Sequence, residues 1–405
     1  MNVYVARQPI FNQRKQLVAY ELLFRDGTAN YVPDLDGDTM TSTVMSNTFF
    51  DIGMDTLLGG KRAFINFTQN LLIQKLPLLM PRETTVVEIL EDVDPQPELI
   101  EACREMGRKG YTIALDDFVY TPELKPLVEL AKIIKFDLRI SSIKEIQGYI
   151  NALPPDCQPI LLAEKVETHE EFAACLDIGC TLFQGYFFCK PEIVEGRSLP
   201  KSSLNLMRIM AAINAEDFDF DHLEELIAPD VTIAYKLMRY INSAFFTRAN
   251  RITSVQQALV YLGQKEIRRF ISMIVMTNLA KGKPSELVRA ACIRAKFCEL
   301  LAGIAPGRMD GRELFTLGMF SLIDAIVDQP MATVMNTLAL AGTIKEALVN
   351  RRGQLIIYLQ LVESYEKGRW KAVGQIARGL KLPEAELPDI YLQACQWGNS
   401  ITQEQ

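Results

Sequence analysis

The stretch TIALDDFVYTPELKPL, residues Thr112 to Leu127, begins as an apolar strand and ends that strand on two adjacent carboxylates, Asp116 and Asp117. Carboxylates at the end of a buried strand are costly to place unless a positive charge lies near them. The residues that follow are bulky and interrupted by proline, so they differ from the pliable loop that a substrate site usually has. The stretch therefore raises the question of whether it belongs to a working metal site.

Short β-rich runs alternate with helical segments from residue 1 to about residue 195. Most of these runs are almost continuously apolar, as expected of strands that are covered on both faces. Helical segments between them, such as residues 98–110 and 168–179, end near a glycine that can close a helix. The alternation predicts a (β/α)₈ barrel with an irregular opening hairpin. Its eight strand candidates are residues 3–11, 17–25, 62–68, 84–90, 112–118, 133–138, 159–166 and 182–188.

A stretch with two prolines, a glycine and mixed charge, residues 189–203, interrupts this alternation and is typical of a linker. Beyond it the chain is almost wholly helical. Residues 254–263, SVQQALVYLG, show a serine N-cap, helical apolar spacing and a terminal glycine. We therefore expect two domains, an α/β barrel over residues 1–195 and an all-helical domain over residues 196–405.

Composition excludes several classes of protein. The net charge of the 405 residues is −7, and no Lys/Arg block is present, which disfavours sequence-specific binding of nucleic acid through a basic face. None of the eight cysteines form a Cys-x-x-Cys pair, so no zinc module is indicated. We find no signal peptide and no apolar run long enough for a membrane span, and we expect a reduced, cytoplasmic protein.

Polar side chains recur at successive strand ends of the first half. In a parallel barrel such residues converge on the mouth at the carboxyl ends of the strands, where barrel enzymes carry out their chemistry. Any one of them alone is more often a cap or a salt-bridge partner, but nine in succession favour a site. They are Glu21, Asn66, Glu88, Asp116, Asp117, Lys135, Glu164, Glu167 and Gln184.

The ligand types in this set indicate which metal would bind. Oxygen donors without histidine or cysteine favour Mg²⁺, Mn²⁺ or Ca²⁺ over zinc. Several carboxylates could hold two cations about 3.5–4 Å apart, an arrangement that clamps a phosphoryl group and generates hydroxide. The strand ends therefore predict a divalent-cation site that acts on phosphate esters.

The first half resembles an EAL domain, the barrel family that hydrolyses cyclic di-GMP to linear pGpG. The resemblance covers about 190 residues and rests on motifs that follow one another in the family order. They read ARQPIF, YELLFR, FINFT, VEILE, ALDDF, IIKFD, AEKVET and FQGYFFCKP. It implies an enzyme that depends on Mg²⁺ or Mn²⁺.

The resemblance also implies roles for individual residues. Lys135 would orient the attacking water, and Glu167 and Gln184 would support the site. Gln8 and Arg25 would contact the nucleotide, Arg25 at a phosphate, where a guanidinium fork fits well. The metal ligands would be Glu21, Asn66, Glu88, Asp116, Asp117 and Glu164.

Two departures from the family are concentrated at the mouth. Lys165 replaces the glycine of the family's EGVE motif. After ALDDF, which ends at Phe118, the family continues with a Gly/Ser-rich loop that shapes the metal site and a dimer contact, whereas here the chain reads VYTPELKPL. Val119 and Tyr120 cannot easily adopt positive φ, so the family's usual coupling of loop, metal site and dimer contact is altered. The sequence therefore leaves undecided whether the protein forms a homodimer.

The second half resembles an HDOD domain, a helical relative of the HD phosphohydrolases that lacks their catalytic residues. The resemblance rests on NSAFF, ITSVQQALVYLG and IRRF, which occur in the expected order. His222 is the only histidine in this half, too few for an HD metal site. A non-catalytic role as a module that binds a signalling partner follows. Together the two halves resemble the YuxH-like family.

Two functions remain open at this point. The first is a metal-dependent phosphodiesterase that opens cyclic di-GMP, supported by the complete ligand set. The second is an inactive effector or scaffold that binds the nucleotide, a partner protein or both. The altered loop and Lys165 favour the second, because an ammonium at the mouth could repel a cation or bind phosphate without aiding hydrolysis.

Overall fold

The computed structural model describes most of the chain, and the statements below concern that part. The described residues are 4–25, 57–190, 206, 209, 212–213, 219–228, 231–241, 252, 254–280, 283–307, 309–338 and 340–402. The chain divides into two compact units. One comprises Met1–Phe188 with Leu361–Gln405, and the other comprises Cys189–Gln360.

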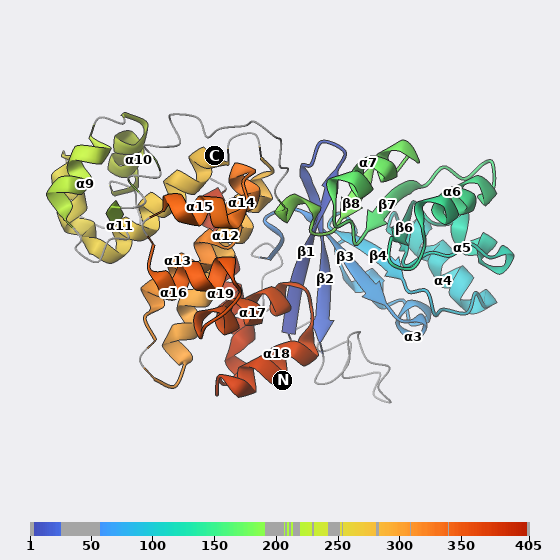
Figure 1. The fold of residues 1–405 in the computed structure, drawn as a ribbon. Helices are drawn as coiled ribbons and strands as arrows, with labels where there is room; N and C mark the ends of the chain where they lie inside the picture. Colours follow the sequence, from blue (N-terminus) through green and yellow to red (C-terminus); the bar gives the residue numbers. More distant parts are fainter. Residues whose placement is uncertain are drawn as a thin grey trace. The chain divides into compact units, whose positions relative to one another are not determined.

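Eight strands close into a barrel in the order β1 to β8 (Figure 1). Strands β2 to β8 run parallel, whereas β1 is antiparallel to both of its neighbours, β2 and β8. The predicted barrel with an irregular opening hairpin is thus confirmed. The strands are β1 (Tyr4–Asn12), β2 (Leu17–Arg25), β3 (Arg62–Phe67), β4 (Thr85–Ile89), β5 (Thr112–Leu115), β6 (Ile133–Asp137), β7 (Ile160–Glu164) and β8 (Leu182–Gln184).

One layer of apolar side chains fills the barrel interior, and each of the first seven strands contributes one residue to it. Leu182 of β8 packs against this layer. Side chains alternate between the two faces of a strand, so the residue two positions nearer the mouth also faces inward. The next layer toward the mouth is therefore fixed by the first. The apolar layer consists of Ile10, Ala19, Phe64, Val86, Ala114, Ile133 and Leu162.

Helices connect the parallel strands, and their starts follow from the sequence. Ser142 and Thr168 each form a capping box with a glutamate three residues later, which satisfies backbone N–H groups at the helix start. The loop after Asp117 forms a short 3₁₀ turn before α5. The helical elements are α3 (Gln69–Ile73), η1 (Leu76–Leu79), α4 (Pro97–Arg108), η2 (Pro122–Leu124), α5 (Lys125–Val128), α6 (Ile143–Ala152), α7 (His169–Asp177) and η3 (Phe187–Cys189).

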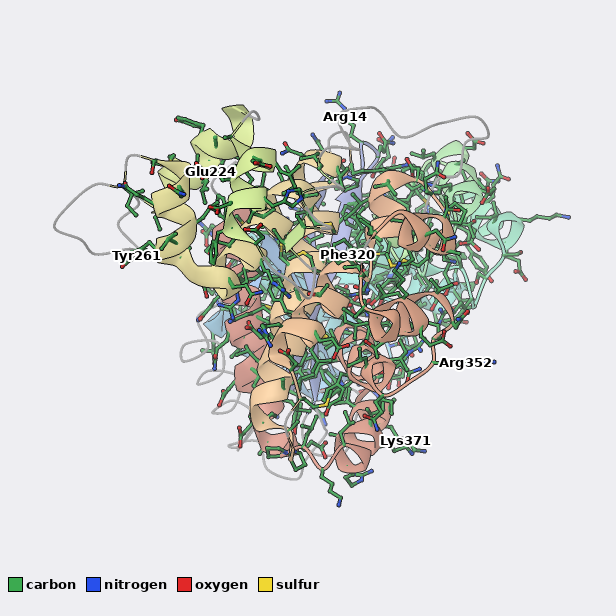
Figure 2. The ribbon with its side chains drawn as sticks, turned by 60° about the vertical axis from the view of Figure 1, so that its left-hand side comes forward. Arg14, Glu224, Tyr261, Phe320, Arg352 and Lys371 are labelled. Atoms are coloured by element: carbon green, nitrogen blue, oxygen red, sulfur yellow. The ribbon has the colours of Figure 1, made fainter. Side chains whose placement is uncertain are left out.

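The second unit is helical. Ser254 caps α11 as predicted, and Gly263 interrupts that helix with a φ of 71°, where the sequence predicts a helix end. Phe320 lies inside this unit and Tyr261 at its surface (Figure 2). The helices are α9 (Phe220–Ile227), α10 (Val231–Ile241), α11 (Val255–Leu279), α12 (Ser285–Ile304), α13 (Gly311–Phe320), α14 (Ile323–Val327), α15 (Met331–Thr337), α16 (Gly342–Val349) and the first part of α17 (Leu355–Glu366).

The last helices, α18 (Trp370–Gly379) and α19 (Leu387–Thr402), belong with the barrel. Tyr4 of β1 packs its ring against Tyr365 and Trp370, and its hydroxyl donates to the Glu384 carbonyl at 2.9 Å. We call this interface the C-terminal seam, and define it by Tyr4, Arg7, Tyr365, Trp370 and Asn399.

Arg7 shows how closely the C-terminal seam is built. Its guanidinium donates to the Leu57 carbonyl and to Oδ1 of Asn399, the latter at 3.3 Å, and it stacks over the ring of Tyr20. The sequence predicts one helical domain over residues 196–405, whereas residues 361–405 pack with the barrel. Periodicity identifies a segment as helical, but it does not show which core the apolar face of the helix joins.

Within the described ranges, no helix is both long and apolar enough to cross a lipid bilayer.

Candidate metal centre

The polar layer at the mouth lies two residues beyond the apolar layer of the barrel. Alternation along the strands brings eight predicted site residues to this level, one from each strand or from the residue directly after it. The structure therefore gathers side chains that are spread over about 180 positions of the sequence. The residues are Gln8, Glu21, Asn66, Glu88, Asp116, Lys135, Glu164 and Gln184.

Lys135 stands at the centre of this layer and is fully buried. Its Nζ lies 2.6 Å from Glu88, 2.7 Å from Asp116, 3.0 Å from Glu164 and 3.8 Å from Glu21. One ammonium thus pairs with four carboxylates and offsets part of their mutual repulsion. We call Glu21, Glu88, Asp116, Asp117 and Glu164, together with Lys135, the mouth cluster.

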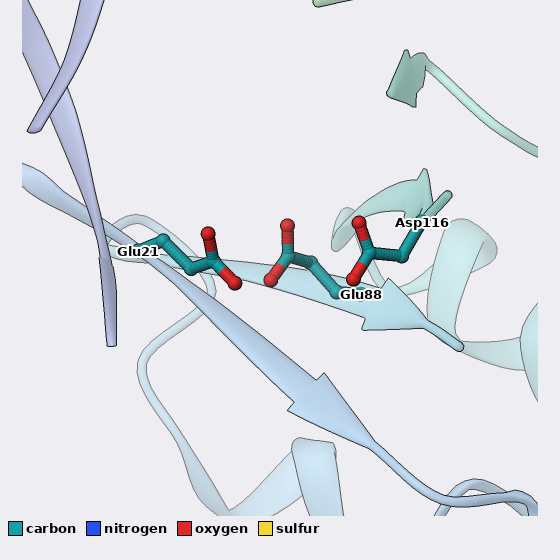
Figure 3. A group of neighbouring side chains, drawn as sticks. All are labelled: Glu21, Glu88 and Asp116. Carbon is teal, nitrogen blue, oxygen red and sulfur yellow. The ribbon is translucent and has the colours of Figure 1, made fainter. Parts of the chain in front are cut away.

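Two groups of three carboxylates within the mouth cluster are each close enough to hold one cation. The first consists of Glu21, Glu88 and Asp116, and the second of Asp116, Asp117 and Glu164. Figure 3 shows the three carboxylates of the first group side by side, with that of Glu88 between those of Glu21 and Asp116. Asp116 belongs to both groups, so the two groups would hold their cations close to each other.

Glu21 is held in place by neighbouring amides. Asn66 donates from Nδ2 to Oε1 of Glu21 at 3.1 Å, and Gln184 donates from Nε2 to Oε2 of Glu21 and to Oε1 of Gln8 at 2.9 Å. Each amide presents its N–H groups to the carboxylate. Its own oxygen is left buried without a hydrogen bond inside the described part of the chain.

We call residues 119–127, which replace the Gly/Ser-rich loop of the family, the substitute loop. Backbone hydrogen bonds hold the chain on both sides of the aspartate pair that precedes it. The backbone N–H of Asp116 donates to the Ile89 carbonyl at 2.9 Å, and that of Phe118 donates to the Lys135 carbonyl at 2.9 Å. Asp117 has a φ of 40°, a left-handed conformation that aspartate tolerates better than most residues, whereas Val119 and Tyr120 avoid positive φ. The positive φ thus falls on Asp117, and the backbone of Val119 and Tyr120 is free of that strain.

Phe118 anchors this loop. It is 3% exposed, and its ring packs edge-on against Phe136 of β6 with centroids 6.0 Å apart. A ring buried against the neighbouring strand provides a fixed point directly before the residues that differ from the family pattern. The carboxylates of Asp116 and Asp117 therefore remain at the mouth although the loop differs from the family pattern.

Burial and mutual repulsion strongly perturb the protonation of the mouth cluster. Burial raises the pKa of Glu88 and of Glu164 well above the ordinary value, and Lys135 offsets only part of this effect. Burial together with the charge of Asp116 raises the pKa of Asp117 to about 6. Without a cation, protons on these carboxylates relieve part of the repulsion.

Asp116 and Lys135 behave in the opposite way. Burial tends to raise the pKa of Asp116, but the charge and hydrogen bond of Lys135 leave that pKa below the ordinary value. Burial tends to lower the pKa of Lys135, but the surrounding carboxylates raise it well above its ordinary value. Lys135 therefore stays an ammonium, and Asp116 stays ionised beside it.

The residues present fit divalent cations. The mouth cluster contains five carboxylates and one ammonium, so its members carry an excess of four negative charges when all are ionised, which two divalent cations would balance. Several buried oxygens also make no hydrogen bond to protein groups in the described structure, so they are available to a bound cation or to water. They are Asn66 Oδ1, Glu88 Oε2, Asp117 Oδ1, Glu164 Oε2 and Gln184 Oε1.

Two predicted residues belong neither to the polar layer nor to the mouth cluster. Glu167 lies after β7 with its side chain 45% exposed, and it pairs with Arg139. Its backbone N–H donates to the capping glutamate Glu171 at 2.6 Å. Arg25 ends β2 and pairs in register with Tyr4, but its side chain lies outside the described residues.

The sequence analysis missed an ion pair at the mouth. Asp137 is 6% exposed, and its Oδ2 lies 3.4 Å from Nζ of Lys165. Asp137 stands two positions after Lys135 on β6, so it shares the inward face of that strand. The same alternation that identified Lys135 could have identified Asp137.

The histidine of the helical unit has the position expected of a surface residue. His222 lies in the first turn of α9, its side chain is 58% exposed, and its Nδ1 is 3.9 Å from Glu225.

The helical unit matches a known domain family, and two relatives are similar to almost the whole chain. The model of the HDOD domain matches residues 199–341. A Vibrio cholerae protein named cyclic di-GMP phosphodiesterase CdgJ is 36% identical over 400 residues, which cover 98% of this chain and 93% of that relative. The Bacillus subtilis protein YuxH, described as uncharacterized, is 34% identical over 410 residues, covering 99% of each chain.

Solved EAL structures are more distant. The Bacillus subtilis YkuI protein, solved with cyclic di-GMP and calcium, is 19% identical with a TM-score of 0.37, covering 57% of this chain and 73% of that one. An EAL domain protein from Listeria monocytogenes is 19% identical with a TM-score of 0.36, covering 46% and 87%. These likenesses are too weak to bear on the chemistry of the mouth cluster.

The chain is thus a two-unit protein in which a closed barrel with an acidic mouth precedes an HDOD-type helical domain. Its similarity to CdgJ and YuxH extends over almost its whole length. It belongs to the YuxH-like family of EAL–HDOD proteins.

Proposed function

We propose that the barrel hydrolyses cyclic di-GMP to linear pGpG, with divalent cations held by the mouth cluster. The observation that carries this proposal is the pair of carboxylate groups that share Asp116 and leave buried oxygens without hydrogen bonds. The name of the relative CdgJ, which is similar along almost the whole chain, supports the same reaction.

The cations would be Mg²⁺ or Mn²⁺, because every donor is a carboxylate or amide oxygen. When bound, they would neutralise the substrate phosphate and lower the pKa of a water molecule enough to make it a nucleophile. The residues that would hold them are Glu21, Asn66, Glu88, Asp116, Asp117 and Glu164.

The other polar residues of the mouth would position the reactants. Lys135 lies within 3.0 Å of Glu88, Asp116 and Glu164, and from this place beside the ligands it would orient the attacking water. Gln184 fixes Glu21 and would, with Gln8 and Arg25, contact the nucleotide. Glu167 would act from the rim through its pair with Arg139.

The helical unit would serve as a regulatory module that binds a signalling partner, since it lacks the histidines of a metal hydrolase. All eight cysteines are free thiols, which fits a cytoplasmic location. The substitute loop after Asp117 removes the family's usual dimer segment, and a homodimer would need another contact.

The test is to incubate the full-length protein with Mg²⁺ or Mn²⁺ and cyclic di-GMP and to measure pGpG by chromatography. We expect turnover, and we expect Glu21→Gln to reduce kcat by about 10²-fold or more, as for loss of one preorganised electrostatic group. Glu129→Gln is the matched control, because Glu129 is an exposed carboxylate that lies 3.9 Å from Lys125 on α5.

Absence of turnover in the wild-type protein, with the nucleotide still bound in calorimetry, would establish the effector function in place of the enzyme. Absence of both turnover and binding would leave the scaffold function. Equal losses in Glu21→Gln and Glu129→Gln would contradict the assignment of the mouth cluster.

A further inference from the structure

The turn that joins α17 to α18 lies at the rim of the barrel mouth, and we call its residues 367–369 the rim turn. It approaches β2 so closely that a Cβ added to Gly368 would lie 2.7 Å from Cδ1 of Leu23. Leu23 stands two positions beyond Glu21 on β2, so it shares the inward face of that strand. Figure 1 shows α18 beside the arrowhead of β2. The rim turn therefore lies on the mouth side of β2.

Hydrogen bonds to the end of α17 fix the backbone of the rim turn. The N–H of Gly368 donates to the Tyr365 carbonyl at 3.0 Å, and the N–H of Arg369 donates to the Ser364 carbonyl at 2.9 Å. These two bonds form the Schellman motif that commonly ends a helix, with Gly368 at the left-handed position and a φ of 63°. Lys367 directly precedes this glycine, so the motif also fixes its backbone.

Aromatic rings clamp the rim turn to β1. Tyr365 and Trp370, which lie on either side of the turn, are both buried and pack against Tyr4. Tyr4 pairs in register with Arg25 at the end of β2, so this contact also lies at the level of the rim. The rim turn thus belongs to the barrel unit and has a defined place at its mouth.

Lys367 extends from the rim turn toward β8. Its Nζ lies 4.4 Å from the ring centroid of Tyr186, which follows Gln184, the last residue of β8, by two positions. Strand β1 lies between β8 and β2 in the barrel, so the rim turn spans the end of β1. Gly368 is on the β2 side and Lys367 is on the β8 side. An ammonium from the C-terminal part of the chain therefore stands at the rim of the mouth.

An ammonium at this level suits a phosphate of a bound nucleotide. The rise along a strand is about 3.3 Å per residue, so the level of Leu23 is roughly 7 Å beyond that of Glu21. A cyclic dinucleotide has two phosphodiester groups, and when one of them lies on the cations, the rest of the molecule extends beyond them. Lysine binds phosphate as a compact point charge. A half-buried lysine on a fixed turn also loses less freedom on binding than a mobile one.

We propose that Lys367 is a nucleotide-binding residue of the barrel mouth and contacts the phosphate of cyclic di-GMP that does not lie on the cations. This inference rests on the proposed function, since it takes the mouth to be the nucleotide site. The C-terminal segment then contributes to substrate binding as well as to the stability of the barrel.

The test is calorimetric titration of the full-length protein with cyclic di-GMP in the presence of Ca²⁺, a cation that oxygen ligands bind. Lys367→Gln should weaken binding by about five- to tenfold, the effect of one charged contact that solvent partly screens. The loss should shrink at high salt. In assays of pGpG formation with Mn²⁺, KM should rise by a similar factor and kcat should stay unchanged, because the contact is made equally before and during the reaction.

Two variants serve as controls. Lys371→Gln removes the same charge from an exposed lysine in the first turn of α18 and should bind cyclic di-GMP as the wild type does. Lys367→Arg keeps the charge and should retain binding. Equal binding by Lys367→Gln and the wild type would overturn the inference. So would equal losses in Lys367→Gln and Lys371→Gln, which would indicate net charge, or in Lys367→Gln and Lys367→Arg, which would indicate packing.

The outcome is separable from that of the proposed function. Binding of cyclic di-GMP that depends on the charge of residue 367, without formation of pGpG, would support the inference and contradict the enzyme. Formation of pGpG with a KM that does not respond to Lys367→Gln would support the enzyme and contradict the inference. Absence of any binding of cyclic di-GMP would contradict both.

Discussion

The mouth cluster and the C-terminal seam both involve the β1–β2 hairpin, yet they are built on opposite principles. In the mouth cluster, four carboxylates crowd one ammonium, and several buried oxygens have no hydrogen bond in the described structure. In the C-terminal seam, aromatic rings pack edge to face, and Arg7 donates to two acceptors. The mouth cluster thus has buried polar groups without hydrogen bonds in the described structure, whereas the C-terminal seam is closely packed.

This difference separates function from stability. Unsatisfied buried charge destabilises a fold and persists where a ligand completes it, whereas packed rings contribute mainly to stability. Substitutions in the two regions should therefore change different measurements. Changes at the seam should lower the melting temperature, and changes at the mouth should alter cation binding with little effect on folding.

The largest effect is expected from removing the seam. A chain that ends at Gln360 lacks Trp370 and Tyr391, which are 3% and 2% exposed in the full-length protein, and it leaves the ring of Tyr4 uncovered. Loss of several large buried side chains, each worth roughly 3–5 kcal/mol, exceeds the stability of a typical domain. We expect no cooperative unfolding transition of the barrel in calorimetry. A truncated protein that melts within a few degrees of the full-length chain would show that the seam is dispensable.

A smaller and different effect is expected from Glu88→Gln. Burial raises the pKa of Glu88 well above its ordinary value because it disfavours the charged form, and glutamine replaces the carboxylate by a neutral group of similar size. The melting temperature without metal should change little. The affinity for Mn²⁺ should fall by about 10–100-fold. A large loss of stability with unchanged Mn²⁺ binding would contradict this prediction, because the mouth cluster would then serve stability and not cation binding.

The smallest effect concerns Asp117 and pH. Burial and the charge of Asp116 raise the pKa of Asp117 to about 6 from an ordinary value of 3.8. The folded state therefore binds more protons than the unfolded state between these values, and its stability falls as the pH rises through them. Without metal, Asp117→Asn should melt roughly 2–4 °C above the wild type at pH 7 and near it at pH 4. Mn²⁺ should remove the advantage at pH 7. An equal difference at both pH values would contradict the pKa as its cause.

Much of the barrel and of the mouth cluster could be predicted from the sequence. Glu21, Asn66 and Glu88 each follow an apolar residue of the core layer by two positions, so strand alternation fixes their direction. Glu167 lies beyond the end of β7, where alternation no longer applies, and its side chain turns to Arg139.

The C-terminal seam could not be predicted in this way. The apolar face of α18 indicates a buried helix, but any core could bury it. The pairing of Tyr4 with Trp370 joins residues at opposite ends of the chain, and a single sequence carries no local signal for such a contact.

The position of residues 361–405 in the barrel unit has a consequence for biosynthesis. Strand β1 leaves the ribosome before the helical unit, and α19, which contacts β1, leaves after that unit. The barrel unit therefore cannot be completed during translation until the helical unit between its two parts has been made. The nascent barrel has to keep the ring of Tyr4 from other chains during that interval, so we expect it to depend on chaperones more than a barrel made from one continuous segment.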